Sequence, residues 1–502
     1  MATDVLFIHP GYQKNTYQDL SREFTAIDVP VWAALLANHV RNKGFDCAIH
    51  DVNVQGWNDS ILKDILNHSD PKLIVMMVYG HQPSASTQTM PAARKIACDL
   101  KAHDKHLLLA MGGTHPSALP ERTMKEEAVD YIISGEGTDT IVGLIKHLRG
   151  ECRLTDVPGL WYKQDGTPEF TGKADPIEDL DNELAGYAWD LLPDLGHYRA
   201  HTWHCFEYFK NSAETTFADV RTPYVSIYTS LGCPFSCHFC CVNAIFGKAG
   251  VRYWSVERVV DWLGELVEKH GVKNVRFADE LFVLSPKRVK RFCDLMIDRG
   301  YDMNIWAYAR VDTISEKLLS KMKRAGINWL CLGIESGNPC VREDVSKPIN
   351  KDIARIVQQI RDAGIYIMGN YMFGLPEDSL ETMQQTLDLA MSLNCDFVNF
   401  YVTMAYPGSE LYKDALKKDL IPDKWVAYSQ HNYDTQPLPT RFLSPKEVMK
   451  FRDEAFNTYF NNTKYLDMIE RKFGTKTRKH IEKMLQLGIE RRLTSANSDS
   501  NS

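Results

Sequence analysis

Four cysteines fall within nine positions in the stretch CPFSCHFCC, which begins at residue 233. Three of them, Cys233, Cys237 and Cys240, have the spacing C-x3-C-x2-C in a loop directly after a β-branched run. Thiolates bind zinc and iron–sulfur clusters. A structural zinc site commonly takes four ligands from two separated C-x2-C pairs, and the sequence holds no second pair. Three thiolates instead fit three corners of an iron–sulfur cubane and leave one iron open to an outside ligand.

Chance cysteines in a loop, or a redox-sensitive patch, would also place thiols together. The neighbouring Phe235 and Phe239 favour a cluster, because apolar cover tunes and protects such a centre. Cys241 adjoins Cys240 and cannot easily reach the same iron, so we expect a packed thiol there. The other eight cysteines are scattered singly and fit small buried hydrophobes in a chain with reduced thiols.

The cysteine spacing, with an aromatic residue directly before the third cysteine, resembles the signature of radical S-adenosylmethionine (SAM) enzymes. The resemblance implies that the three cysteines bind a [4Fe–4S] cluster, that SAM chelates the fourth iron, and that SAM is cleaved to a 5′-deoxyadenosyl radical. FADEL, WAYARVD, GIESG, YMFGLPEDS and YPGSELY follow in the order of the family's later motifs, although turn formation and capping explain each of them taken alone. The resemblance implies SAM-binding roles, with Asp279 or Glu280 as the contact to the SAM amino group, for Phe239, Asp279, Glu280, Arg310, Glu335, Ser336 and Gly374.

These motifs end the strands of an alternating strand and helix series. Six such units predict a partial (βα)6 barrel over residues 223–415, with its active site at the carboxyl ends of the strands. Aromatic residues near that end are candidate walls for a substrate, although each is more often core packing. They are Trp306, Tyr308, Tyr371, Phe400 and Tyr401.

A second alternation of strands and helices, over residues 1–150, predicts a doubly wound parallel sheet of the α/β class. Ligands of such sheets bind beyond the carboxyl ends of the strands, where glycine lets the backbone approach closely. Four loops at that edge, HPG, YGHQPS, GGTHPSA and GEG, predict a binding face, although any single loop is more simply a turn. The candidate residues are His9, Gly11, Gly80, His81, Gly112, Gly113, His115, Gly135, Glu136 and Gly137.

A doubly wound domain before a radical SAM barrel resembles the Rossmann-like cobalamin-binding domain of cobalamin-dependent radical SAM enzymes. The sequence lacks D-x-H-x-x-G, the pattern by which methionine-synthase-like proteins place a histidine below the cobalt. Whether His9, His81, His115 or none of them contacts the corrin stays open. Residues 151–222 are expected to form a connector with a hairpin at Asp165–Gly166, and residues 416–502 a helical region with a disordered tail.

Composition limits the partners of this 502-residue chain. A formal net charge of −7 argues against nucleic acid, whose binding proteins concentrate lysine and arginine on one face. No signal peptide or long uncharged apolar run is visible, so we expect a cytoplasmic protein without stable membrane insertion.

The resemblance implies a methyltransferase in which the radical activates a small-molecule substrate that then receives a methyl group from methylcobalamin. Such an enzyme needs an electron donor, for example flavodoxin or ferredoxin. Two alternatives stay open: the same cofactors in a cyclase or oxidative rearrangement enzyme, as in the anaerobic magnesium-porphyrin-cyclase-like members, or a non-catalytic iron–sulfur or zinc redox sensor. The sequence names no acceptor substrate, catalytic residue or oligomeric state.

Overall fold

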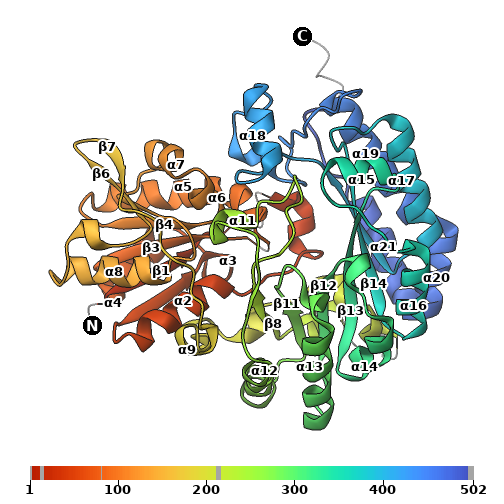
Figure 1. Ribbon diagram of the computed structural model, residues 1–502, viewed down its shortest axis with the longest axis horizontal. Helices are drawn as coiled ribbons and strands as arrows, with labels where there is room; N and C mark the ends of the chain where they lie inside the picture. The colour runs from red at the N-terminus through yellow and green to blue at the C-terminus, as the bar shows by residue number, and fades with distance from the viewer. Residues whose placement is uncertain (1–2, 12–15, 81, 211–215, 496–502) are drawn as a thin grey trace.

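Two parallel sheets organise the computed structural model, which describes residues 3–11, 16–80, 82–210 and 216–495. Figure 1 shows the first sheet in the red to yellow part of the chain, beside the second in the green to blue part. His81 and the last seven residues of the predicted tail lie outside the described residues. The α/β fold with a Rossmann-like domain followed by a partial barrel is confirmed.

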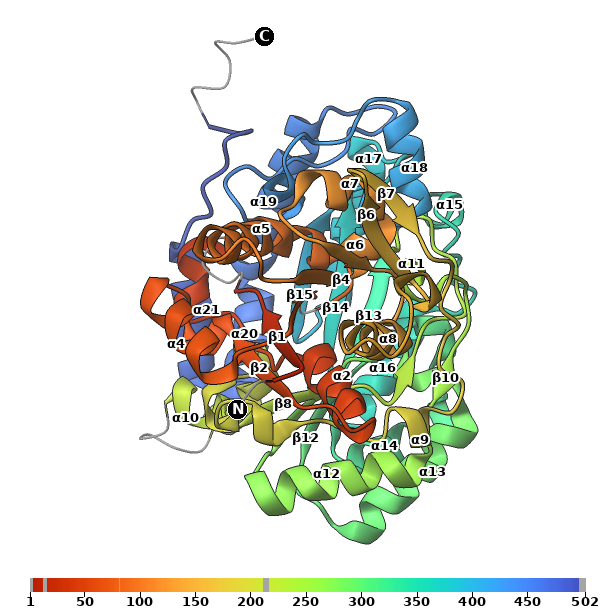
Figure 2. The same cartoon turned by 90° about the vertical axis from the view of Figure 1, so that its left-hand side faces the viewer.

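The first sheet has the strand order β2-β1-β3-β4-β5-β6-β7, and its first five strands are parallel. Those five are β1 (Val5–His9), β2 (Cys47–Asp51), β3 (Leu73–Val78), β4 (Leu109–Gly113) and β5 (Tyr131–Ile133). The helices of this domain are α2 (Val31–Asn42), α3 (Val52–Gln55), α4 (Asp59–Ser69), α5 (Ala85–His103), α6 (Thr114–Ala118), α7 (Pro120–Glu126) and α8 (Thr138–Leu148). In Figure 2, α2 and α8 pack together on one face of the sheet and α5 lies on the other. Cover on both faces explains the continuous apolar run of β3, in which every residue is buried.

A hairpin of β6 (Leu160–Gln164) and β7 (Thr167–Phe170) pairs antiparallel with β5. Its turn has left-handed backbone at Asp165 and Gly166, as a tight Asp-Gly turn requires. The sequence places this hairpin in a connector that starts at residue 151. In the structure it extends the first sheet to Phe170, because the free edge of β5 is there to accept it.

The second sheet has six parallel strands in the order β15-β14-β13-β12-β11-β8. They are β8 (Tyr224–Ile227), β11 (Asn274–Phe277), β12 (Asn304–Ala309), β13 (Ile327–Glu335), β14 (Tyr366–Phe373) and β15 (Phe397–Val402). The helices between and after them are α11 (Asn243–Phe246), α12 (Val256–His270), α13 (Pro286–Arg299), α14 (Leu319–Arg324), α15 (Pro339–Asp344), α16 (Ile353–Asp362), α17 (Leu380–Leu393) and α18 (Glu410–Lys417). Left-handed glycines end α12 and α13, so the chain can reverse at once into the next strand.

Short helices link the two sheets, and three longer ones close the chain. The linking segments include α9 (Leu180–Glu183), the 3₁₀ segment η5 (Thr202–Phe209) and α10 (Phe217–Arg221). The closing helices are α19 (Pro445–Phe460), α20 (Thr463–Phe473) and α21 (Thr475–Gln486), and α19 packs on the edge strand β15 (Figure 1). Across the part of the chain that the structure describes, no helix combines the length and apolarity needed to span a bilayer.

Buried polar contacts join the two domains at the carboxyl edge of the first sheet. Asp28 accepts a hydrogen bond of 2.5 Å from Ser226 Oγ of β8, and it lies 3.1 Å from Arg276 of β11. Trp32 of α2 donates to Tyr228 Oη at 3.3 Å. These groups are almost fully buried, so the carboxyl edge of the first sheet is held against the barrel rather than open to solvent.

Candidate active site

A short antiparallel ribbon holds the cysteine loop at the end of β8. Its strands are β9 (Ser230–Leu231) and β10 (Arg252–Tyr253), and Gly250 N donates to Cys233 O at 3.0 Å between them. Gly232 has φ +90°, and a side chain there would meet Gly250 O at 2.5 Å. Only glycine fits this approach, which explains the glycine directly before the first cysteine.

The three predicted ligand cysteines are free and half-buried in this loop. A turn with Cys240 N donating to Cys237 O at 3.0 Å brings the backbone of the second and third cysteines close together. Burial raises the pKa of the Cys233 thiol to about 11, and it raises the pKa of Cys237 and Cys240 as well. A bound cationic centre reverses this effect and holds thiols deprotonated. Cys241, which we expected to be a packed thiol, is buried beside them.

Among the described residues, no three histidine, cysteine or acidic side chains lie close enough together to bind a single metal ion. A [4Fe–4S] cluster makes a different demand, because each thiolate binds a different iron. The three half-buried thiols on one glycine-anchored loop fit that demand.

The two acidic residues after β11 have separate surroundings. Asp279 is buried and accepts from Thr229 N at 2.5 Å, Thr229 Oγ1 at 2.6 Å and Ser230 Oγ at 2.6 Å. It therefore fixes the start of the cysteine loop. Glu280 lines a cavity instead, where burial and the Asp279 charge raise its pKa to about 8. Of the two candidates for the SAM amino group, only Glu280 presents its carboxyl to open space.

Arg310 lies directly against the cysteine loop at the end of β12. Its Nη1 is 3.8 Å from Cys237 Sγ, and its guanidinium lies 4.1 Å from the Phe235 ring centre. Two 3.0 Å bonds to Asp312 hold the guanidinium in this position. The cation is thus oriented to interact with thiolate charge, and it also lines the cavity.

At the end of β13, Glu335 has a left-handed backbone with φ +63° and forms a buried ion pair with Lys347. Both side chains line the cavity, and Lys347 also lies 5.8 Å from the Phe239 ring centre. Lys347 is not predictable from the sequence, because it stands in a loop between α15 and α16 without any motif around it.

Two other predicted SAM residues do not line this cavity. Ser336 is fully buried, where its hydroxyl lies 3.2 Å from Thr386 Oγ1 and accepts from Asn338 N at 3.1 Å. Gly374 has φ +83°, and a Cβ there would lie 2.5 Å from Val448 of α19. In the structure both shape the backbone behind the cavity.

The cavity itself has a volume of about 260 Å³ and lies between the domains. The cysteine loop, the carboxyl ends of the barrel strands, and residues 82–84 of the first domain form its wall. Besides the residues above it is lined by Phe239, Cys240, Cys241, Tyr308, Asn370, Met372, Tyr401, Met404, Tyr406 and Gln430. Of the predicted aromatic walls, Tyr308 and Tyr401 face it.

Most of the predicted cobalamin residues line one of two narrow clefts, and the other described members of the set pack within the first domain. Gly112, Gly113, Gly135, Glu136 and Gly137 line one cleft together with Trp32 of α2. His9 and Gly80 line the second, which Arg276 closes from the barrel side. Both clefts lie at the carboxyl edge of the first sheet, and with volumes of about 10 and 20 Å³ each has room for only about one water molecule.

Three residues of this set have evident structural roles. Glu136 forms a buried ion pair with Arg252 of β10 and accepts from Ile177 N at 3.1 Å. Gly11 packs against Val52, whose Cγ1 would lie 2.9 Å from an added Cβ. His115 is buried, where its Nδ1 lies 3.1 Å from Thr87 Oγ1 and its ring 4.5 Å from that of Trp425. Burial lowers the pKa of His115 to about 3, so its ring is neutral.

Comparison with known proteins matches both halves of this arrangement. Residues 227–390 match the model of the radical SAM superfamily, and residues 20–145 match that of the B12 binding domain. The chain is a radical SAM protein with a B12-binding domain. The cofactors expected from the sequence, a [4Fe–4S] cluster, SAM and cobalamin, are those that these two domain types bind.

Relatives of this cobalamin-dependent radical SAM enzyme include proteins of two activities. An uncharacterized methyltransferase of Pyrococcus horikoshii is 28% identical over 440 residues, which cover 87% of this chain and 89% of that protein. The anaerobic magnesium-protoporphyrin IX monomethyl ester cyclase of Rubrivivax gelatinosus is 24% identical over 92% of this chain and 78% of its own length. The solved structure of OxsB, a cobalamin-dependent S-adenosylmethionine radical enzyme, covers 97% of this chain and 71% of its own with a TM-score of 0.70 at 15% identity.

Proposed function

We propose that this enzyme is a methyltransferase that acts on a small-molecule substrate. The observation that carries the proposal is the cavity between the domains, because Cys240 of the cluster loop and Gln82 to Ser84 of the B12-binding domain line the same space. A substrate there is within reach of both cofactor sites. Methyl transfer needs this arrangement, since one centre must activate the substrate carbon to which the other supplies the methyl group.

When bound, the cluster with SAM supplies a hydrogen-abstracting radical, and cobalamin supplies the methyl group. The chain's own residues position these groups. Cys233, Cys237 and Cys240 hold the cluster, and Arg310 balances thiolate charge beside it. Glu280 would accept a hydrogen bond from the amino group of SAM, and its carboxyl would have to be ionised against the burial that raises its pKa.

Lys347 binds a carboxylate of the bound SAM while its partner Glu335 keeps the ammonium oriented. The apolar side chains of Met372 and Met404 exclude water from the same wall. Partial exposure of Cys233 and Cys237 leaves the loop accessible to an electron donor of the flavodoxin or ferredoxin class. Such a donor places the enzyme in a reducing compartment such as the cytoplasm.

A second candidate is a cyclase or oxidative rearrangement enzyme, which would use the same two cofactors. It is favoured by the cyclase relative, whose similarity extends over 92% of this chain. The two activities differ in the fate of the SAM methyl group, because only the methyltransferase places it in the product.

The test uses enzyme purified and reconstituted without oxygen, with cobalamin, dithionite and SAM carrying a deuterated methyl group. A small-molecule extract of the source cells provides the substrate, and mass spectrometry follows 5′-deoxyadenosine and labelled products. We expect 5′-deoxyadenosine together with a product heavier by one deuterated methyl group. A new product without label supports the cyclase, and a protein that never cleaves SAM contradicts both.

A further inference from the structure

A second cavity, of about 340 Å³, adjoins the first on the side of the closing helices. The two share Gln82, Ser84, Tyr308, Tyr401, Tyr406 and Gln430 in their walls, so they are adjacent at the strand ends. The volume falls within the range of small-molecule sites, roughly 300–1,000 Å³. This space is therefore large enough for a substrate whose reacting carbon reaches the SAM cavity.

Aromatic rings form much of the second cavity's wall. Trp203 contacts Trp306 edge to face, with ring centres 5.0 Å apart, and lies stacked at 6.1 Å from Phe397. Phe456 of α19 and Phe400 of β15 also line the second cavity. Rings in these positions offer flat apolar surfaces, which favour a ligand with an aromatic body.

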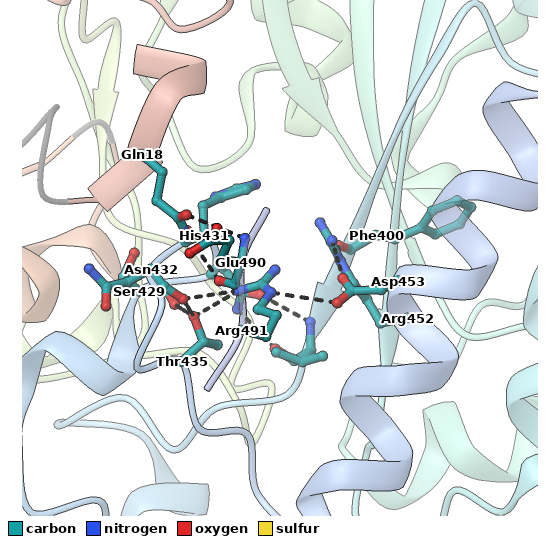
Figure 3. A network of polar contacts seen from close by, with 12 residues as sticks. Gln18, Phe400, Ser429, His431, Asn432, Thr435, Arg452, Asp453, Glu490 and Arg491 are labelled. Carbon is teal, nitrogen blue, oxygen red and sulfur yellow. Dashed lines mark hydrogen bonds and ion pairs between the residues drawn. The ribbon is translucent and has the colours of Figure 1, made fainter. Parts of the chain in front are cut away.

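One corner of this cavity holds more positive than negative charge. Arg452 and Asp453 of α19 line it, and Arg491 lies behind them (Figure 3). Arg452 Nη1 donates to Asp453 at 2.7 Å, while Arg491 Nε lies 3.5 Å from the same carboxylate. Two buried guanidinium groups thus share one carboxylate. The nearby Arg492 is paired with Asp434 and leaves this balance unchanged.

The donors of both arginines are only partly used. Arg452 Nε donates to Phe400 O at 2.8 Å, but Nη2 has no acceptor among the described residues. Arg491 Nη1 donates to Thr435 Oγ1 at 2.8 Å, whereas its buried Nη2 has no partner within the same part of the chain. Burial and the two arginines together hold the pKa of His431 well below its usual value, so this neighbouring ring is neutral.

We infer that the second cavity binds the substrate through a carboxylate, held by Arg452, with an aromatic body against the tryptophan and phenylalanine wall. A surplus of one positive charge matches a monoanion, which favours a carboxylate over a phosphate dianion. Arg452 lines only the second cavity, so it anchors the substrate away from the carbon that reacts. This inference rests on the proposed function and names its substrate class.

The test measures binding of a simple probe, so that it does not depend on turnover. Equilibrium dialysis of the cofactor-loaded enzyme compares 2-naphthoate with 2-naphthamide, which has the same rings and no charge. We expect naphthoate to bind about tenfold to hundredfold more tightly, in line with one charge-assisted hydrogen bond. Arg452→Gln should abolish this preference, whereas Arg355→Gln, at an exposed arginine of α16, should retain it.

Asp453→Asn is a second variant, which tests the inference independently if Arg452→Gln fails to fold. Removal of the competing carboxylate should tighten naphthoate binding several-fold and leave naphthamide binding unchanged. Equal binding of the two probes, absent binding of naphthoate, or a preference that survives Arg452→Gln overturns the inference. SAM cleavage in the same preparations is measured separately, so failure of the proposed function is recognised independently.

Discussion

At the scale of single residues, the site depends on which side chains face open space. Asp279 and Glu280 are neighbours in the sequence. Asp279 accepts three hydrogen bonds from the start of the cysteine loop, whereas Glu280 lines the cavity. Arg310 is likewise fixed by Asp312, so its remaining donor is directed to Cys237. Substitutions of the adjacent Glu280 and Asp279 should therefore differ in effect, one on SAM binding and the other on stability.

Replacement of Glu280 by Gln should weaken SAM binding by roughly tenfold, because a neutral amide loses the charge-assisted contact to the SAM amino group. The variant should be at least as stable as wild type, since burial raises the pKa of this carboxyl and disfavours its charge. Equilibrium dialysis with SAM and thermal unfolding check these two expectations.

Asp279→Ala is the matched comparison. Loss of its carboxyl leaves Thr229 N and two hydroxyl groups without their acceptor, which should lower the free energy of unfolding by about 2–4 kcal/mol. If Glu280→Gln unfolds the protein and Asp279→Ala only weakens SAM binding, the assignment of the two residues is reversed.

Cys237→Ala should abolish the iron–sulfur absorbance and the formation of 5′-deoxyadenosine under dithionite, because two thiolates cannot replace three. Cys98→Ala, at an exposed cysteine of α5, is the control and should retain both signals. Iron and sulfide analysis with product quantification decides the outcome, and full SAM cleavage by Cys237→Ala would contradict the ligand assignment.

At the scale of elements, the turns after the strands carry both function and stability. After β14, Asp378 accepts from Gly374 N at 3.0 Å and Leu375 N at 2.9 Å through one oxygen, and from Thr382 Oγ1 at 2.7 Å through the other. This carboxyl is fully buried, and burial raises its pKa to about 6 despite the three hydrogen bonds. The turn is therefore built around a charge that the folded state disfavours.

Asp378→Asn should stabilise the protein at neutral pH. The amide oxygen can accept both backbone bonds, and the amide nitrogen can donate to Thr382 Oγ1, whose single proton can then go to Ser379 O, 3.2 Å away. Because the folded pKa lies above the unfolded value of 3.8, wild type loses stability as pH rises from about 4 to 6. The stability gain of the variant should thus grow by about 1 kcal/mol between pH 5 and pH 7. Urea unfolding at the two pH values measures this difference, and a gain independent of pH contradicts it.

At the scale of the whole molecule, buried polar pairs fix one domain against the other. Asp28 pairs with Arg276 of the barrel strand β11, and Glu136 pairs with Arg252 of the ribbon that holds the cysteine loop. Both pairs are more than four-fifths buried, so each depends on its partner to offset the cost of desolvation. The cavity between the cofactor sites keeps its shape only while these contacts persist.

Glu136→Gln should lower the free energy of unfolding by about 3 kcal/mol, because it leaves the Arg252 charge buried without a counterion. Glu257→Gln breaks an exposed pair with Arg291 on the surface of the barrel and should change stability by less than about 1 kcal/mol. Denaturant unfolding compares the two variants, and equal effects would show that the buried pair does not hold the domains.

Local patterns were enough to determine the class of chemistry and the two sheets. The cysteine spacing and the alternation of strands and helices depend on neighbours in the chain, so the sequence alone predicted the cluster loop and the fold, and the resemblance of these motifs to a known family implied SAM and cobalamin. The hairpin after residue 150 was harder to place, because only the free edge of β5 shows which sheet it joins.

Tertiary structure decided which residues meet. Lys347 has no local motif, and only the fold brings it to Glu335 and Phe239. Arg452 and Arg491 lie far from the barrel motifs in sequence, and they form one charged corner only because α19 packs on β15 and Arg491 pairs with Asp453 of α19. Residues 82–84 reach the cluster loop because the two sheet edges face each other. Contacts between distant segments follow from packing and burial rather than from spacing, so no local pattern of residues encodes them.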